Sequence, residues 1–220
     1  MIIVMLGAPG SGKGTYGRIL NEKYDIPHIS SGEIFRNYVK KHDKLGKEIN
    51  SYILEGKLIP DELAIKTIER RLLEKDTING FILDGYPRNE NQAMQLDNLL
   101  NNIDKKINIA INLTVPDEVI IDRVINRVTC DKCRSIYNLK YSPPKELYKC
   151  DICGMPLTKR DDDTEETVKN RLNTYHQISE PLIKYYEEKD ILYQLKINED
   201  LGETKKEIFK SINEYMCREN

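Results

Sequence analysis

The chain has 220 residues, which is enough for one sizeable core with small inserted subdomains but too few for two large independent domains. Its 34 Lys and Arg residues nearly balance its 36 Asp and Glu residues, so no global field would hold DNA, RNA or another polyanion. No window approaches the roughly 18 consecutive apolar residues of a membrane span, and no basic region precedes the first apolar run, so we expect a cytoplasmic protein without a membrane partner.

A glycine-rich loop follows the first apolar run. Residues 2–6 (IIVML) predict a buried strand, residues 7–15 (GAPGSGKGT) form the loop, and a helical pattern begins directly after it. Inward backbone N–H groups, the positive end of the helix and the charge of Lys13 together predict a site for a nucleotide polyphosphate. The alternative, a plain turn, is disfavoured by the lysine. The hydroxyl residue of the pattern comes one place late, at Thr15 after Gly14, so we do not expect it to ligate Mg²⁺ directly.

Four further apolar runs alternate with helical patterns, which predicts an α/β fold. Because strands that alternate with helices pair in parallel, we expect a P-loop-type three-layer sandwich around a five-stranded parallel sheet. The predicted strands lie within residues 2–6, 26–29, 81–83, 107–115 and 191–197.

Residues 30–59 predict a small helical excursion from the sheet. Ser30 and Glu33 fit a capping box at the start of a helix that carries Arg36, and a second short amphipathic helix ends at Gly56. The segment has too few apolar residues for an independent core, so we expect a helical flap over the site.

The strand at residues 81–83 is followed by two charged residues within the sequence DGYPR. Asp84 ends the strand on the side where ligands of open α/β sheets bind, and we predict that it holds Mg²⁺ or its water shell. An aspartate here is usually only a turn residue, but the phosphate loop favours the metal role. The planar fork of Arg88 suits bidentate contact with a phosphate.

Two arginines and an acidic run are ambiguous by themselves. Arg123 and Arg127 lie four residues apart on a predicted helix, and for this pair alone a solvated basic face is the favoured interpretation. Residues 161–163 (DDD) precede a long helix capped by Thr164. A metal site is one interpretation of this run, but we favour a role as partners of the helix dipole. We expect Pro181 to kink or split that helix.

Four cysteines form two CxxC pairs separated by 16 residues. Cys130, Cys133, Cys150 and Cys153 match the spacing of a structural zinc site, in which four thiolates form a closed tetrahedron. A redox CxxC motif is the alternative, and four thiolates also suit iron. The pairs lie among strand and turn signals rather than at the start of a helix, so we predict a small β lobe held together by zinc.

The remaining cysteine and the histidines lack a partner pattern. We interpret Cys217 as an ordinary thiol near the C-terminus and assign structural or surface roles to His28, His42 and His176. None of the motifs offers an evident general base.

The motifs together resemble those of the adenylate kinases. Six segments occur in the order and spacing of that family, essentially from end to end: GAPGSGKGT, SSGEIFR, GKLIPDE, DGYPRN, DRVINR and TEETVKNRL. The chain is most similar to the long-lid bacterial type, whose lid binds zinc through four cysteines. This resemblance implies the reaction ATP + AMP = 2 ADP, with Mg²⁺ bound alongside ATP and a structural Zn²⁺ in the lid, carried out by a cytoplasmic monomer whose partners are ATP, AMP and ADP. It also implies a core (residues 1–29, 60–126 and 164–220), an AMP-binding flap (30–59) and a zinc-binding lid (127–163).

The resemblance further implies a role for each matching residue. The ATP phosphates would bind Gly10, Ser11, Gly12, Lys13, Gly14 and Thr15. The transferring phosphoryl group would be surrounded by Lys13, Arg88, Arg123, Arg160 and Arg171, with Asp84 near the Mg²⁺. AMP would bind Ser31, Arg36, Lys57, Leu58, Ile59, Gly85, Tyr86, Pro87, Arg88 and Gln92, together with Arg160 and Arg171. The ATP side would be covered by Arg127, Ile136, Tyr137 and the backbone near Glu199.

These implied roles reverse the interpretation of Arg123 and Arg127 as a solvated face. Two positions depart from the family pattern, because Ser31 replaces the usual threonine and Tyr86 the usual phenylalanine. A hydroxyl remains at Ser31, so we expect the preference for AMP to persist.

Two other functions remain open from the sequence. One is a kinase of another nucleoside monophosphate, or one that uses GTP as donor; Gln92 and the long zinc lid argue against the UMP/CMP type. The other is a zinc-ribbon ATPase that binds nucleic acid, which the near-zero net charge and the lack of a concentrated basic, aromatic surface disfavour. We therefore expect no nucleic-acid partner.

Overall fold

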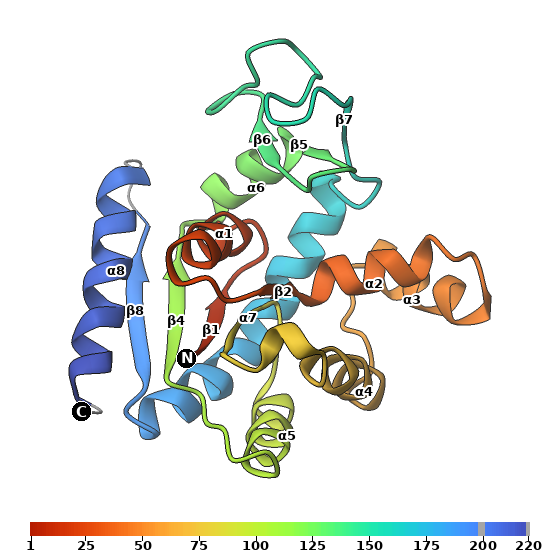
Figure 1. Cartoon of the computed structure of the whole chain (residues 1–220). Coiled ribbons are helices and arrows are strands. Elements are labelled where there is room, and N and C mark those ends of the chain that lie inside the picture. Colours follow the sequence, from red (N-terminus) through yellow and green to blue (C-terminus); the bar gives the residue numbers. More distant parts are fainter. Residues whose placement is uncertain (198–200, 219–220) are drawn as a thin grey trace.

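A five-stranded parallel sheet forms the centre of the molecule (Figure 1). The computed structural model describes residues 1–197 and 201–218. The strands follow the order β2 (His28–Ser30), β3 (Phe81–Asp84), β1 (Ile2–Gly7), β4 (Ile109–Thr114) and β8 (Leu192–Lys196). The predicted α/β fold and all five predicted strands are therefore confirmed.

Helices cover both faces of the sheet. One face packs against α4 (Asp61–Leu72), α5 (Glu90–Asn101) and α7 (Glu165–Glu188), and the other against α1 (Lys13–Tyr24) and α8 (Leu201–Arg218). Ile2 and Val4 belong to the first core, whereas Ile3 and Met5 belong to the second. Because side chains alternate across a strand, a strand covered on both faces is apolar at nearly every position, which is why these strands were recognisable as continuous apolar runs.

Two smaller parts project from the sheet (Figure 1). The helical pair consists of α2 (Ser31–Val39) and α3 (Lys44–Leu54). The cysteine lobe, which follows α6 (Asp117–Ile125), is a three-stranded antiparallel sheet of β6 (Ile136–Asn138), β5 (Arg127–Cys130) and β7 (Leu157–Thr158). A short 3₁₀ turn, η1 (Lys75–Thr77), precedes β3. The helical excursion and the β lobe thus lie where the sequence predicted them.

Three predicted helix features had different outcomes. Thr164 caps α7, because its Oγ1 accepts a hydrogen bond from the backbone N of Thr167 at 3.2 Å. Ser30 precedes α2 but its side chain makes no capping hydrogen bond, so the capping box is wrong. The expected split at Pro181 is also wrong, since α7 continues through it with Tyr186 buried in the core beyond it.

No helix within the described ranges is long and apolar enough to cross a membrane.

Candidate active site

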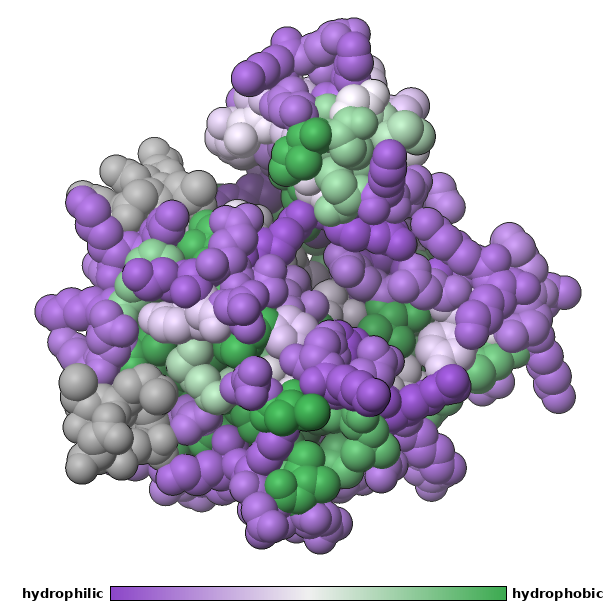
Figure 2. All heavy atoms as spheres, viewed as in Figure 1, coloured by the Kyte–Doolittle hydropathy of each residue, from purple (hydrophilic) through white to green (hydrophobic). Residues whose placement is uncertain are grey.

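A cleft of about 630 Å³ lies between the carboxyl edge of the sheet, the helical pair and the cysteine lobe. Its walls come from the glycine-rich loop, the turn after β3, the segment that follows α3, strands β5 and β6, and α7. The surface is hollowed beneath the lobe at the top of Figure 2, and hydrophilic residues surround the hollow. The cleft therefore lies at the sheet edge where parallel α/β folds bind ligands.

The glycine-rich loop wraps around its own lysine. Lys13 Nζ donates to the carbonyl oxygens of Gly7 and Ala8 at 2.7 and 2.8 Å. Desolvation lowers the pKa of Lys13 to about 8, although the charge of Asp84 opposes that shift. A phosphate beside Lys13 would restore the preference for the charged amine, so the position suits an anionic ligand.

The backbone of the loop requires its glycines. Gly10 and Gly12 have φ angles of +88° and +105°, in the region that favours glycine. A Cβ on Gly10 would also lie 2.6 Å from Val124 Cγ2 of α6. The hydroxyl of Ser11 is buried and has no hydrogen-bond partner among the residues that the structure describes, so it is available to a ligand oxygen.

Asp84 and His28 form a pair at the carboxyl end of the sheet. His28 Nε2 lies 3.3 Å from Asp84 Oδ2, and the two side chains are only 11 and 12% exposed. Burial opposes ionisation of Asp84, but the hydrogen bond with His28 and the charge of Lys13 outweigh it, and the pKa of Asp84 falls below its ordinary value. An ionised carboxylate facing a phosphate loop is a ligand that Mg²⁺ prefers, so the residues present fit the predicted magnesium role.

Sequence analysis missed His28 as a residue of this site. It lies on β2, and only the pairing of β2 with β3 brings it beside Asp84. Its ring also packs against α1, where a Cβ on Gly17 would lie 2.5 Å from it.

Six of the arginines that line the cleft are those predicted from the sequence, and they come from separate elements. They are Arg36, Arg88, Arg123, Arg127, Arg160 and Arg171. Desolvation and the charge of Arg171 lower the pKa of Arg88 to about 10. Desolvation and the charge of Arg127 likewise lower the pKa of Arg160 to about 9. Cations crowded in one cleft repel one another unless anions lie among them, so this cleft is suited to several phosphate charges.

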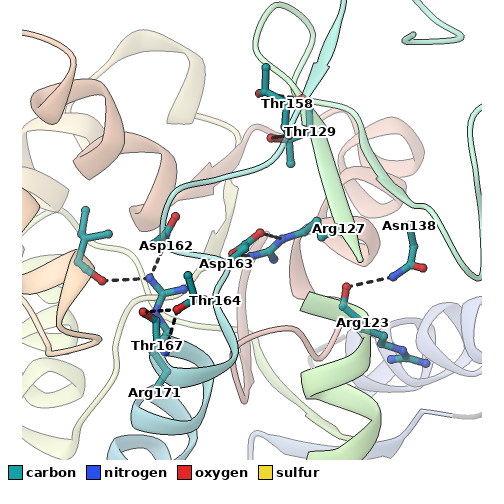
Figure 3. Close-up of polar contacts among 11 residues, drawn as sticks. Arg123, Arg127, Thr129, Asn138, Thr158, Asp162, Asp163, Thr164, Thr167 and Arg171 are labelled. Carbon is teal, nitrogen blue, oxygen red and sulfur yellow. Dashed lines mark hydrogen bonds and ion pairs between the residues drawn. The ribbon is translucent and has the colours of Figure 1, made fainter. Parts of the chain in front are cut away.

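Two aspartates hold two of these arginines (Figure 3). Arg127 donates from Nε and Nη2 to Asp163 at 2.8 and 2.5 Å, and Arg171 Nη2 donates to Asp162 Oδ2. Both aspartates are buried, Asp163 at 0% and Asp162 at 5% exposure. The prediction that they are partners of the helix dipole is wrong, because α7 begins only at Glu165 and each carboxylate instead neutralises a guanidinium.

The turn after β3 is built against the start of α2. Ser31 Oγ donates to the carbonyl oxygen of Gly85 at 2.7 Å, and a Cβ on Gly85 would lie 2.8 Å from that hydroxyl. Gln92 Oε1 accepts from the backbone N of Arg88 at 2.8 Å, while its Nε2 donates to Asp61 at 2.7 Å. Gln92 is buried behind the cleft wall and positions the turn that carries Arg88.

The other predicted residues lie in or around the same cleft. Its lining includes Gly10, Ser11, Gly12, Lys13, Gly14, Thr15, Lys57, Leu58, Ile59, Asp84, Gly85, Pro87, Ile136 and Tyr137. Tyr86 is buried, and its hydroxyl donates to the carbonyl oxygen of Gln92 at 3.3 Å. Glu199 lies outside the described residues.

The four predicted cysteines meet at one point in the lobe. The sulfur atoms of Cys130, Cys133, Cys150 and Cys153 all lie within 4.8 Å of one another. A tetrahedral zinc site with metal–sulfur bonds of about 2.3 Å has sulfur–sulfur distances of about 3.8 Å, so the donor set and its spacing fit a zinc ion. None of the four cysteines lines the cleft, which is consistent with a closed structural site.

The cysteine lobe also touches the helical pair. Lys40 Nζ lies 3.2 Å from Asp131 Oδ1, and Arg134 Nη2 donates to Asn37 Oδ1 at 3.2 Å. Arg18 of α1, which also lines the cleft, donates to the carbonyl oxygen of Arg134. The lobe and the helical pair are therefore in direct contact beside the cleft.

Comparison with known proteins agrees with this geometry. The profile of the family described as adenylate kinase matches residues 5–191. The chain belongs to the adenylate kinase family. The adenylate kinase of Acetivibrio thermocellus is 45% identical over 213 residues, which cover 97% of this chain and 98% of the relative. That of Archaeoglobus fulgidus is 47% identical over 208 residues, 94% of this chain and 96% of the relative. That of Clostridium botulinum strain Langeland is 42% identical over 219 residues, 100% of both chains.

Membership of the adenylate kinase family accounts for a cleft with cations on two sides. The glycine-rich loop and Arg123 border one side, whereas Arg36 and the segment after α3 border the other. An adenylate kinase must hold two nucleotides with their phosphates facing each other, and a cleft lined in this way offers cations to both.

Proposed function

We propose that the chain transfers the terminal phosphoryl group of ATP to AMP, in the reversible, Mg²⁺-dependent reaction ATP + AMP = 2 ADP. It is a nucleoside monophosphate kinase of the adenylate kinase family, with a role in adenine nucleotide homeostasis and AMP salvage. The observation that carries this proposal is the convergence of a glycine-rich loop and the six predicted arginines in one cleft. One polyphosphate would occupy the loop, and the number of additional cations calls for a second phosphorylated ligand.

The chemistry of the reaction matches the residues of the cleft. The phosphate of AMP is already ionised at neutral pH, so its attack on ATP needs no general base. What the site must supply is neutralisation of phosphate charge in a place from which water is excluded. We assign this work to Lys13, Arg88, Arg123, Arg160 and Arg171, while Asp162 and Asp163 hold Arg171 and Arg127 in place.

The two nucleotides are assigned to opposite sides of the cleft. The donor ATP binds residues 10–15, with Arg127, Ile136 and Tyr137 on its outer side. The acceptor AMP binds Arg36, residues 57–59 and the turn at residues 85–88, against Ser31 and Gln92. In this proposal residues 30–59 act as the AMP-binding flap, residues 127–163 as the lid and the remainder as the core.

Two metal ions belong to the proposal. Asp84 would hold Mg²⁺ or its water shell beside the ATP phosphates, and that ion supplies further neutralisation of the charge that develops during transfer. The four cysteines would hold a structural Zn²⁺ that fixes the fold of the lobe without touching substrate. We further propose that the enzyme acts as a cytoplasmic monomer without a nucleic-acid partner, which its nearly balanced charge supports.

A substrate panel tests the proposal most directly. ADP formation would be followed in a coupled assay with ATP or GTP as donor and AMP, CMP, UMP or GMP as acceptor. We expect the highest kcat/KM for ATP with AMP. A higher value for CMP or UMP would assign the chain to another nucleoside monophosphate kinase, and the absence of any transfer would refute the kinase function.

A further inference from the structure

Tyr137 contacts both the cysteine cluster and the nucleotide cleft. Residue 137 belongs to the lining of the cleft, while its side chain points into the lobe, where its Oη lies 3.6 Å from Cys150 Sγ and accepts a hydrogen bond from the backbone N of Asp151 at 2.9 Å. A metal-bound thiolate carries no proton, so the phenol O–H is the donor in this contact and the sulfur the acceptor. A single residue therefore joins the wall of the cleft to the cysteine cluster.

The packing around Tyr137 leaves the cleft wall and the cysteine cluster little freedom to move independently of each other. The buried cluster of the lobe consists of Val128, Cys130, Cys150 and Leu157, and the partly buried Tyr137 packs against it together with the other two cysteines. Val128 is paired with Tyr137 across β5 and β6, in the same strand that carries Arg127 at its start and Cys130 at its end. With a rise of about 3.3 Å per residue, this strand places the cleft arginine only about 10 Å from the cysteine cluster.

We propose that Tyr137 couples nucleotide binding in the cleft to metal binding by the four cysteines. A donor nucleotide packed against the cleft side of β6 would hold this strand, and with it the Tyr137 phenol, in the orientation in which the hydroxyl bonds to Cys150. The nucleotide then stabilises the metal-binding arrangement of that sulfur, and the bound metal in turn prepares the cleft wall for the nucleotide. By thermodynamic linkage the two effects are equal in size. Tyr137 is thus a positioning residue at a junction, and the inference rests on the proposed binding of ATP in this cleft.

Zinc affinity measured with and without nucleotide tests the coupling. The full-length protein would compete for zinc against a chelating dye, in excess Mg²⁺, with or without a non-hydrolysable ATP analogue. A protein-free sample corrects for zinc bound by the nucleotide itself. Couplings between sites usually range from about 5-fold to about 150-fold. We expect the analogue to tighten zinc binding by at least about fivefold in the wild type, and by a clearly smaller factor in Tyr137→Phe, which keeps the ring but lacks the hydroxyl.

Ser135→Ala provides a matched control. Ser135 Oγ lies 3.0 Å from Cys133 Sγ, so this variant also removes a hydroxyl from a cysteine of the cluster. Ser135 does not line the cleft, so zinc affinity should fall while the factor gained from the nucleotide stays as in the wild type. Thermal unfolding of both zinc-loaded variants checks that the lobe remains folded.

Calorimetric titration of the ATP analogue into zinc-loaded and zinc-free protein supplies the reciprocal measurement. The affinity ratio should equal the one obtained from zinc competition, within error. The inference is overturned if the analogue binds the wild type without changing zinc affinity, or if Tyr137→Phe keeps the full factor. If the analogue fails to bind the zinc-loaded wild type at all, the proposed function fails as well, and the calorimetry identifies that outcome directly.

Discussion

Individual charges in the cleft differ in how far the protein itself neutralises them. Arg127 and Arg171 each have a buried aspartate, whereas Lys13 has only backbone carbonyl oxygens and a neighbouring carboxylate at Asp84. Because carbonyl dipoles compensate a desolvated ammonium less well than an anion does, Lys13 gains more than Arg127 or Arg171 when a phosphate arrives. Two predictions follow from this difference.

Replacing Lys13 by methionine should lower kcat by about 10² or more, because the proposed transfer then lacks a cation that would neutralise the reacting phosphates. Methionine keeps a similar length and removes only the charge and its hydrogen bonds. Steady-state kinetics with ATP and AMP would measure the loss, and the thermal unfolding temperature would show that the fold is intact. Near-normal turnover in this variant would remove Lys13 from the mechanism.

The affinity of the free enzyme for ATP should fall as the pH rises through about 8, where Lys13 loses its proton. A bound polyphosphate favours the protonated amine and raises its pKa, so binding takes up a proton above pH 8. The dissociation constant should then increase by up to about tenfold per pH unit until the pKa of the complex is reached. Binding titrations from about one pH unit below the Lys13 pKa of about 8 to about one and a half units above it would measure this slope. Lys13→Met should lack it, and an equal slope in that variant would assign the proton to another group.

Residues of the site were predictable from sequence when their chemistry lay in one contiguous motif. The phosphate loop around Lys13 needed no knowledge of the fold. In contrast, His28 and Asp84 are 56 residues apart, and Arg127 and Asp163 are 36 apart. Such pairs depend on which strands are neighbours and on where a lobe folds back, and no local pattern contains that information.

At the scale of whole elements, periodicity predicted the strands because each one is buried on both faces. The rule that proline interrupts a helix failed at Pro181, where tertiary packing outweighed it. The proline removes one backbone donor, but α7 stays continuous because its buried side chains on both sides of that residue pack into the core. Periodicity also gives no information about contacts between elements, such as the contact between the cysteine lobe and the helical pair. The Lys40–Asp131 ion pair in that contact has no sequence signal, since its residues are 91 positions apart.

Reversing one charge of the Lys40–Asp131 pair should weaken the contact between lobe and helical pair. Both side chains are more than half exposed, at 54 and 60%, so the effect on global stability should stay below about 1 kcal/mol. An interaction of that size still changes a closed-to-open ratio by about fivefold, and KM for both nucleotides should rise in Lys40→Glu and in Asp131→Lys.

The double variant with both charges exchanged is the control for that prediction. It restores attraction with the opposite polarity, so KM should return towards the wild-type value. If the double variant is as impaired as the sum of the two single variants, the residues act independently and the contact does not hold the two parts together.

The molecule as a whole combines cores of different kinds. The sheet has extensive apolar clusters on both faces, and the helical pair shares one of them through Phe35 and Ile49. The buried cluster of the cysteine lobe is separate and small, with Val128, Leu157 and two of the four cysteines, Cys130 and Cys150. A lobe of this size buries too little apolar surface to fold alone, and the proposed zinc ion would supply the stability that its core lacks.

Removing zinc should therefore unfold the lobe while the sheet stays folded. Structural zinc in small modules is worth on the order of 10 kcal/mol in apparent binding free energy, more than the lobe gains from its few apolar contacts. In Cys130→Ser, hydrogen exchange should lose protection over β5, β6 and β7 but keep it in β1 and β4. Cys217→Ser, outside the two CxxC pairs, should retain both zinc and protection. Protein purified without chelator should contain one zinc per chain. Because an unfolded lobe could no longer exclude water from the cleft, zinc-free protein should also divert phosphoryl transfer from AMP to water, raising the ratio of ATP hydrolysis to ADP formation from AMP. A zinc-free wild type with an intact lobe would contradict the structural role of the metal.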